Sequence, residues 1–200
     1  MKRGSKGIEG LTERACALGA TAAVIIPATA LVVEERFAEM CAAPTRCPSY
    51  GLAPGCPPHA MKPEAFRDLL RCYQQVLVFK IDAPVTALMG PERLEIARTI
   101  HGIAATLEQE AISRGFPRAR GWAAGSCKEL FCPHQEACMV LEKNLGCPYA
   151  DRARPSLSAL GVNFTLLDAT AGWKFEKIEE QTGTTNDPAM GLMAGMVLIA

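Results

Sequence analysis

Apolar residues along this chain follow helical spacing in some stretches and extended spacing in others. The longest helical pattern covers residues 91–114 and ends at Gly115, a residue that commonly terminates helices. Its apolar positions recur three and four residues apart and share one stripe: Ile96, Ile100, Ile103, Leu107 and Ala111. This pattern predicts an amphipathic helix that packs against a larger apolar surface.

Shorter elements are predicted on both sides of this helix. Helical spacing, a proline in a first turn or a capping serine predicts helices over residues 11–19, 62–73, 136–143 and 156–160. Short apolar runs predict strands over residues 22–26, 30–35, 76–81, 119–125, 162–167 and 193–199. Residues 179–188 are polar and predict a mobile loop. We therefore expect an α/β fold, with a mixed sheet flanked by helices in one compact domain spanning residues 1–200.

Composition and charge exclude some classes of partner. Lysine plus arginine equals aspartate plus glutamate, and aromatic residues make up only 6% of the 200 residues. A neutral chain with few aromatics has neither the field nor the stacking surface that nucleic acid binding requires. Residues 19–33 are apolar after a basic start, but Pro27 divides the run, and residues 190–200 are too few to span a bilayer. We expect a cytoplasmic protein with no membrane segment.

Cysteine is the outlier in the composition. The chain has nine cysteines, an odd number that cannot all pair, and it is long enough to build a core without disulfides. Seven of them fall in two segments, residues 41–59 and 125–156, that we expect to form loops. Clustered thiols in such a chain favour metal binding over disulfide formation.

The second segment carries four thiols, the number that completes the ligand set of a [4Fe–4S] cluster or of tetrahedral zinc. They are Cys127, Cys132, Cys138 and Cys147, with glycines and prolines between and beside them that let the backbone wrap round a compact object. The spacing lacks the two tight CxxC pairs of a zinc ribbon, and its longer intervals favour an iron–sulfur cluster, with zinc as the alternative. Lys128, Arg152 and Arg154 lie near enough in sequence to offset an anionic cluster, or they are ordinary surface cations.

The first segment carries three thiols, Cys41, Cys47 and Cys56. A cubane cluster held by three cysteines leaves one iron open to water, substrate or another ligand. His59, Cys72, Cys16 and an exogenous molecule are the candidates for this fourth ligand. Cys72 and Cys16 are more typical of small core residues, and a histidine at position 59 or 134 more often orients a loop than binds metal. His101 is expected on the surface or in the core of its helix.

These segments resemble a known family. The first is Cys41…Cys47-Pro48…Tyr50-Gly51…Cys56-Pro57-Pro58-His59, followed by Pro63-Glu64-x-Phe66. The second is Cys127-Lys128-x2-Phe131-Cys132…Cys138…Cys147…Ala153-Arg154-Pro155-Ser156…Gly161-Val162…Ala171-Gly172-Trp173. Together they resemble the predicted metal-binding protein family of unknown function, whose members occur in anaerobic bacteria and archaea. The resemblance covers about residues 15–173 and implies cysteine metal binding, without a settled reaction.

The sequence therefore favours three functional hypotheses over a fourth, a cysteine-rich α/β domain that binds no metal. The first is an iron–sulfur protein, with one or two [4Fe–4S] clusters, that acts in redox chemistry or electron transfer with a partner protein or a small-molecule substrate. The second is an accessory protein that delivers electrons or metal to a larger enzyme. The third is a zinc-stabilised protein with no redox role. No dinucleotide-binding or phosphate-binding glycine motif points to a nucleotide cofactor.

Overall fold

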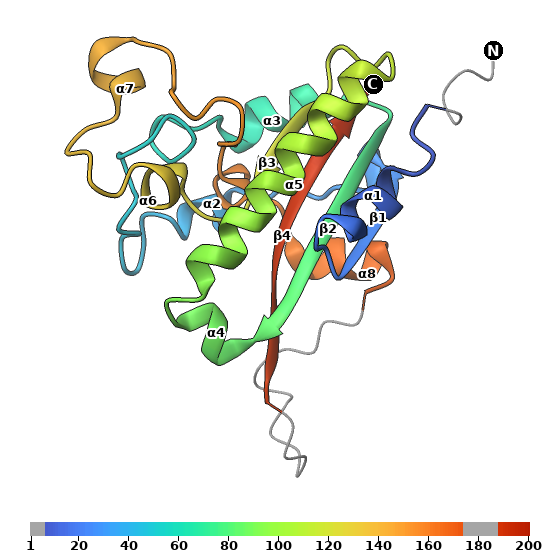
Figure 1. Ribbon diagram of the computed structural model, residues 1–200. Coiled ribbons are helices and arrows are strands. Elements are labelled where there is room, and N and C mark those ends of the chain that lie inside the picture. The colour runs from blue at the N-terminus through green and yellow to red at the C-terminus, as the bar shows by residue number, and fades with distance from the viewer. Residues whose placement is uncertain (1–6, 174–187) are drawn as a thin grey trace.

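A computed structural model describes residues 7–173 and 188–200 of the chain (Figure 1). The elements are α1 (Leu11–Ala17), β1 (Ala22–Pro27), η1 (Ala28–Ala30), α2 (Glu35–Glu39), α3 (Pro63–Leu70), β2 (Gln75–Pro84), α4 (Val85–Met89), α5 (Arg93–Ser113), β3 (Arg120–Ala123), α6 (Cys127–Phe131), α7 (Met139–Lys143), η2 (Leu157–Leu160), α8 (Phe164–Ala171) and β4 (Met190–Ile199). The four strands form one sheet in the order β1-β2-β4-β3.

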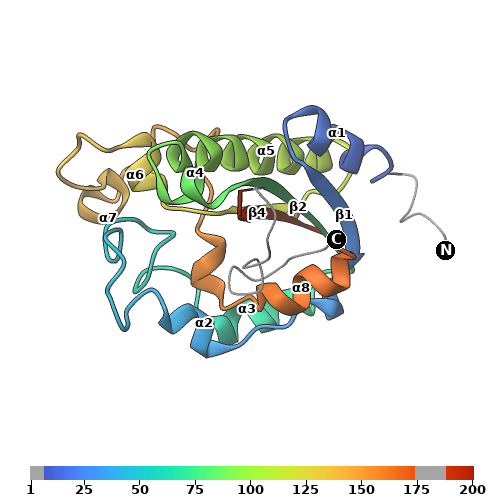
Figure 2. The same cartoon turned by 90° about the horizontal axis from the view of Figure 1, so that it is seen from below.

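Helices cover both faces of the sheet, so the molecule has three layers. Seen from below, α1, α4 and α5 lie on one side of the strands, and α2, α3 and α8 lie on the other (Figure 2). Each side has its own apolar core. Ile100, Ile103 and Leu107 of α5 fill the first core, and Phe66 and Leu70 of α3 fill the second. The expected α/β fold is confirmed.

The two central strands are apolar on both faces because both faces are covered. Along β2, Val76 and Val78 enter the core beneath α3, whereas Leu77 and Phe79 enter the core beneath α5. All four side chains are fully buried. Strand β4 pairs with β2 over ten residues and repeats this alternation. Burial on both faces explains why these strands read as continuous apolar runs rather than alternating ones.

Most predicted elements are present with shifted ends, and the sheet differs in one respect. The strand predicted over residues 193–199 begins three residues earlier, at Met190 of β4, and that predicted over residues 76–81 belongs to the longer β2. All three strand pairs are antiparallel, where a mixed sheet was expected. Within the described part of the chain, parallel pairing is limited to an isolated bridge between Ala123 and Ser156. The predicted loop at residues 179–188 lies outside the described residues, except for Pro188.

The strand predicted over residues 30–35 is wrong. The chain instead forms the short helix η1, and α2 then begins at Glu35. Leu31 and Val33 are buried beneath the sheet, and Val33 makes only an isolated bridge to Val162. The apolar spacing of this segment therefore reflects packing against the sheet rather than membership of it.

The strand predicted over residues 162–167 is also wrong, because a helix starts inside it. The side chain of Asn163 accepts a hydrogen bond from the backbone N–H of Leu166 at 3.1 Å, which caps the first turn of α8. A short apolar run fits a strand and a buried helix equally well. Here the capping asparagine favours the helix.

No helix among the described residues is long and apolar enough to cross a membrane.

Gly195 offers a test of the central packing. A Cβ at this position of β4 would lie 2.4 Å from the ring of Phe79, which is fully buried and cannot swing into solvent. Gly195→Ala is expected to lower the free energy of unfolding by about 1–3 kcal/mol, as overpacking typically does. Equilibrium urea denaturation measures this change.

The matched control is Gly102→Ala, inside α5, where an added Cβ meets no atom within 4 Å. Alanine there is expected to raise the free energy of unfolding by about 0.5–1 kcal/mol through helix propensity. Equal stabilities of the two variants would contradict the proposed crowding at Gly195.

Candidate metal centre

The two cysteine segments project from the same end of the sheet. In Figures 1 and 2, α6 and α7 of the second segment lie beside the chain that follows α2. One cavity of about 230 Å³ is lined by both segments. The second segment contributes the thiols of Cys127, Cys132, Cys138 and Cys147, and the first contributes Ala53, Pro54 and Gly55. The two segments thus build a single site.

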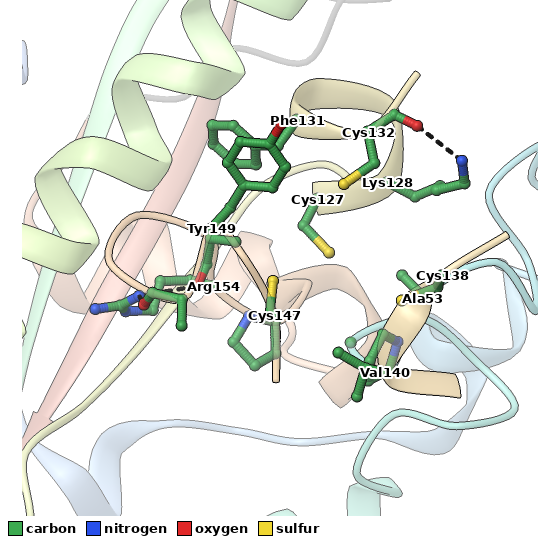
Figure 3. A pocket seen from close by; sticks show the side chains of 15 residues that line it. Ala53, Cys127, Lys128, Phe131, Cys132, Cys138, Val140, Cys147, Tyr149 and Arg154 are labelled. Carbon is green, nitrogen blue, oxygen red and sulfur yellow. Dashed lines mark hydrogen bonds between the residues drawn. The ribbon is translucent and has the colours of Figure 1, made fainter. Parts of the chain in front are cut away.

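Short helices position the thiols of the second segment. Cys127 is the first residue of α6, and Cys132 follows its last residue. Cys138 stands directly before α7, whereas Cys147 lies in the irregular chain beyond it. Figure 3 shows the sulfur atoms of these residues facing a common space from different stretches of chain. Cysteines far apart in sequence therefore reach one cavity.

The first segment has no helix or strand of its own and is folded by tight turns. The backbone N–H of Cys47 donates to the carbonyl of Cys41 at 3.0 Å, and that of Cys56 donates to Ala53 at 3.0 Å. Cys47 lies close enough to Cys41 to contribute to the rise in its pKa, and both lie close enough to Cys56 to do the same there, although burial is the larger cause at each. Cys47 is exposed, Cys41 is half-buried and Cys56 is buried.

Residues 154–156, here called the connecting segment, join the cysteine segments to the sheet. The N–H of Ala123, at the end of β3, donates to the carbonyl of Pro155 at 3.1 Å, and the N–H of Ser156 donates to Gly55 at 3.1 Å. Gly55 packs so closely here that an added Cβ would lie 2.7 Å from Pro155 Cα. The position of the first segment therefore depends on β3.

The two cysteine sets meet at Cys56. Its Sγ lies 3.2 Å from the Oγ of Ser126, the residue directly before Cys127. The Cys56 thiolate is also close enough to raise the pKa of Cys127, as are Cys147, Cys138 and Cys132. The seven cysteines of the two segments therefore form one continuous group.

Burial favours the protonated thiol at four of these cysteines, Cys41, Cys56, Cys127 and Cys132, when no metal is bound. Burial, with the neighbouring thiols as a smaller cause, raises the pKa of Cys127 to about 12. Burial likewise raises the pKa of Cys56, against a lowering by the Ser126 hydroxyl, and that of Cys132, against a lowering by Lys128. Thiolates that repel one another in a buried place are stabilised by bound metal, which replaces the protons.

Lys128 brings a buried positive charge to the cavity. It is only 8% exposed, and its Nζ donates to the carbonyls of Cys132, at 2.7 Å, and of Gln135. Among the described residues it forms hydrogen bonds with these carbonyls and no ion pair with a carboxylate. A buried ammonium without an anionic partner is costly unless an anion lies nearby. The cavity is therefore prepared for a negatively charged occupant.

Arg154 is the second buried cation of the cavity, and it is held in place on several sides. Its Nη2 pairs with Glu108 at 3.0 Å, and its Nη1 donates to the carbonyls of Ala150 and Ala153. Its backbone N–H donates to Nδ1 of His101 at 3.0 Å. Arg154 thus links the cavity to α5, which carries both Glu108 and His101.

Aromatic rings separate the cavity from α5. Phe131 stacks on Tyr149 with 5.8 Å between ring centroids, and it meets His101 edge to face at 5.5 Å. Figure 3 shows the ring of Tyr149 beside Phe131 on this side of the cavity. His101 is fully buried, and burial lowers its pKa to about 4, so its imidazole is neutral near pH 7. The sequence allowed either a surface or a core position for His101, and the structure places it in the core.

The four thiols of the second segment surround a cavity rather than a point. Among residues 7–173 and 188–200, no three histidine, cysteine, aspartate or glutamate side chains are grouped closely enough to hold a metal ion. Tetrahedral zinc with Zn–S bonds of 2.3 Å needs its sulfurs about 3.8 Å apart. Among the described residues, the four thiols therefore line the cavity without converging on one point.

The structure places the remaining candidate ligands at the surface. His59 and His134 are exposed. Cys16 and Cys72, predicted as core residues, are exposed as well, and that prediction is wrong. Cys16 follows the buried Ala15 on α1 and is turned about 100° from it, toward solvent. Cys72 lies in the turn after α3.

Comparison with known proteins identifies the family. The family model described as predicted metal-binding protein (DUF2284) matches residues 24–199. The chain belongs to this family. The match includes all seven cysteines of the two segments. No curated protein and no solved structure matches the chain. The family description supports metal binding by this DUF2284 chain and does not name the metal.

Sequence reasoning missed several residues of the site. Ser126, Gly55 and Tyr149 could not be selected from the sequence. The roles of Ser126 and Gly55 depend on contacts with residues 70 and 100 positions away, and that of Tyr149 depends on its stacking with Phe131, 18 positions away. Phe131 appeared only as part of the family motif. Arg152, considered beside Arg154 as a cation for the cluster, instead pairs with Asp151 at the surface. Arg152 and Arg154 are only two residues apart, yet the first side chain lies at the surface and the second is buried.

Gly55 tests whether the two cysteine segments depend on each other. Gly55→Ala should push the first segment away from Pro155, because the added Cβ would overlap backbone atoms that cannot move aside. We expect a loss of about 1–3 kcal/mol in the free energy of unfolding and faster alkylation of Cys56 and Cys127 in the metal-free protein. Iodoacetamide labelling followed by mass spectrometry measures the second effect.

Gly146→Ala is the control, since a Cβ there meets nothing within 4 Å and the backbone is not left-handed. If Gly55→Ala and Gly146→Ala label alike, the segments are not interlocked at Pro155.

His101 gives a pH dependence with a defined sign. Its pKa is about 4 in the folded chain and about 6.5 in the unfolded chain, so the unfolded chain binds its proton first as the pH falls. The contribution to stability, about 3 kcal/mol, is complete above pH 6.5 and is lost as the pH falls toward 4.

Chemical denaturation at pH 7 and pH 4.5 measures this loss, with His101→Gln as the comparison because glutamine does not titrate in this range. The variant should lose less stability than the wild type between these two pH values. An equal loss in both proteins would show that carboxylates alone cause the acid sensitivity.

Proposed function

We propose that this protein is a cytoplasmic iron–sulfur protein that acts in redox chemistry or electron transfer. Cys127, Cys132, Cys138 and Cys147 would hold a [4Fe–4S] cluster with all four irons ligated. Cys41, Cys47 and Cys56 would hold a second cluster with one iron open. A redox partner protein or a small-molecule substrate would exchange electrons with the chain.

One observation carries this proposal: four thiols surround a cavity that also contains a buried lysine without a carboxylate partner. A [4Fe–4S] cluster with four thiolates is bulky and net negative. The cavity of about 230 Å³ supports the first property, and the buried charge of Lys128 supports the second.

When bound, such a cluster takes up and releases one electron at a time. The residues of the chain would set the conditions for this. Lys128 and Arg154 favour the more negative, reduced state by their charge. Phe131 and Tyr149 exclude water from one side, and low solvent access changes the reduction potential.

The first set would provide contact with the outside. Cys56 is buried, but Cys47 is exposed and Cys41 is half-buried, so a cluster held by the three would be close to the surface. Three thiols leave one ligand position for substrate or partner. The contact between Cys56 and Ser126 places the two sets side by side, which favours passage of electrons between them.

Purification of the full chain without oxygen tests the proposal. We expect a brown protein with similar amounts of iron and acid-labile sulfide, and a visible absorbance that bleaches on reduction. Two variants separate the sites: Cys132→Ala for the second set and Cys47→Ala for the first. Cys47 is exposed and Cys132 is only half-buried, so their loss should disturb folding little.

Each variant should lose roughly half of the iron if both sets hold a cluster of the same type. Cys72→Ala and Cys16→Ala are the matched controls and should retain all of it. A colourless protein with stoichiometric zinc would overturn the proposal. Loss of iron in the Cys132 variant alone would limit the protein to one cluster.

A further inference from the structure

Ser126 makes an unusual hydrogen bond. It stands at the N-cap of α6, where a serine hydroxyl ordinarily accepts a hydrogen bond from a backbone N–H in the first turn. The structure shows no such capping bond at α6. The hydroxyl is instead directed to the Sγ of Cys56, 3.2 Å away and 70 residues earlier in the chain. Ser126 therefore gives up its local role for a contact between the two cysteine sets.

The surroundings of this contact make it consequential. Ser126 is 5% exposed and Cys56 is 6% exposed, so water does not compete freely for either group. A buried hydroxyl that lacked a partner would cost free energy, and in the described part of the chain its side-chain partner is Cys56. The bond also fixes the distance between Cys56 and Cys127, because Ser126 and Cys127 are adjacent.

Metal binding would reverse the direction of this hydrogen bond. In the metal-free chain the Cys56 thiol donates and the Ser126 oxygen accepts. A metal-bound thiolate has no proton to give, so the Ser126 hydroxyl would donate to the sulfur instead. A donor to a ligand sulfur stabilises negative charge there, and the reduced cluster carries more of it.

We propose that Ser126 is a positioning residue that couples the two cysteine sets and raises the reduction potential of the centre at Cys41, Cys47 and Cys56. This inference rests on the proposed function, because it requires a redox-active centre at that set. It goes beyond it by assigning a role to a residue that is not a ligand and that belongs to the other segment.

Potentiometric titration of the anaerobically purified full chain, followed by electron paramagnetic resonance, tests this role. Ser126→Ala removes the hydroxyl and should shift the midpoint potential of the first centre to more negative values. Ser126→Thr keeps the hydroxyl and should restore a midpoint near that of the wild type. The same titrations in a Cys132→Ala background assign the signal, since only the first centre should remain there.

Ser113→Ala is the control, because it removes a serine hydroxyl whose hydrogen bond is to the carbonyl of Glu110 on α5, outside both cysteine segments. It should leave the midpoint unchanged.

The inference is overturned if Ser126→Ala keeps the wild-type midpoint, or if the alanine and threonine variants shift it equally. If alanine costs the first centre its iron, the threonine variant decides: retention of iron and midpoint supports the role, and loss of both overturns it. A wild-type chain without iron and sulfide defeats the proposed function itself, which is a different result from an unshifted midpoint in an iron-loaded protein.

Discussion

The connecting segment, residues 154–156, is the contact on which the site depends. It lies along the outer edge of β3 and holds Gly55 of the first cysteine segment on its other side. Because β3 belongs to the sheet, the hydrogen bonds of this segment hold both groups of thiols in a defined place relative to the sheet. Without this contact, the first cysteine segment would have no regular structure to fix it, since it contains neither helix nor strand. The close approach at Gly55 shows how little space separates the two segments.

Burial and charge work together around this contact. Burial raises the pKa values of Cys41, Cys56, Cys127 and Cys132, so the metal-free site favours neutral sulfur at these four positions. The same cavity contains the buried cation Lys128, which is expensive to hold in a site that stays neutral, whereas the charge of Arg154 is balanced by Glu108. An anionic metal centre would relieve both costs: the metal would replace the protons, and Lys128 would offset part of the remaining negative charge. This balance is why the family assignment of metal binding and the geometry of the cavity support each other.

Prediction from the sequence succeeded where the pattern reflected a local cause. The helix α5 and the central strands β2 and β4 were recognised because long periodic or doubly apolar runs have few alternative interpretations. It failed at residues 30–35 and 162–167, which are short and apolar. Residues 30–35 are apolar because they are buried beneath the sheet, and residues 162–167 contain the start of a helix that Asn163 caps. Cys16 and Cys72 were wrongly placed in the core, because a cysteine beside apolar residues on a helix can still face solvent.

The sequence by itself determined that this protein has two groups of cysteines, and that four thiols in one group and three in the other suit metal. Residue type and spacing carry that chemistry regardless of fold. Only the tertiary structure decided that the groups are adjacent, that Cys56 meets Ser126, and that Lys128 is buried with no carboxylate partner among the described residues. The hydrogen bonds of Lys128 are local, to carbonyls four and seven residues away, but the first two facts arise from contacts between residues far apart in the chain. Such contacts are set by how the layers pack on the sheet, which no local pattern specifies.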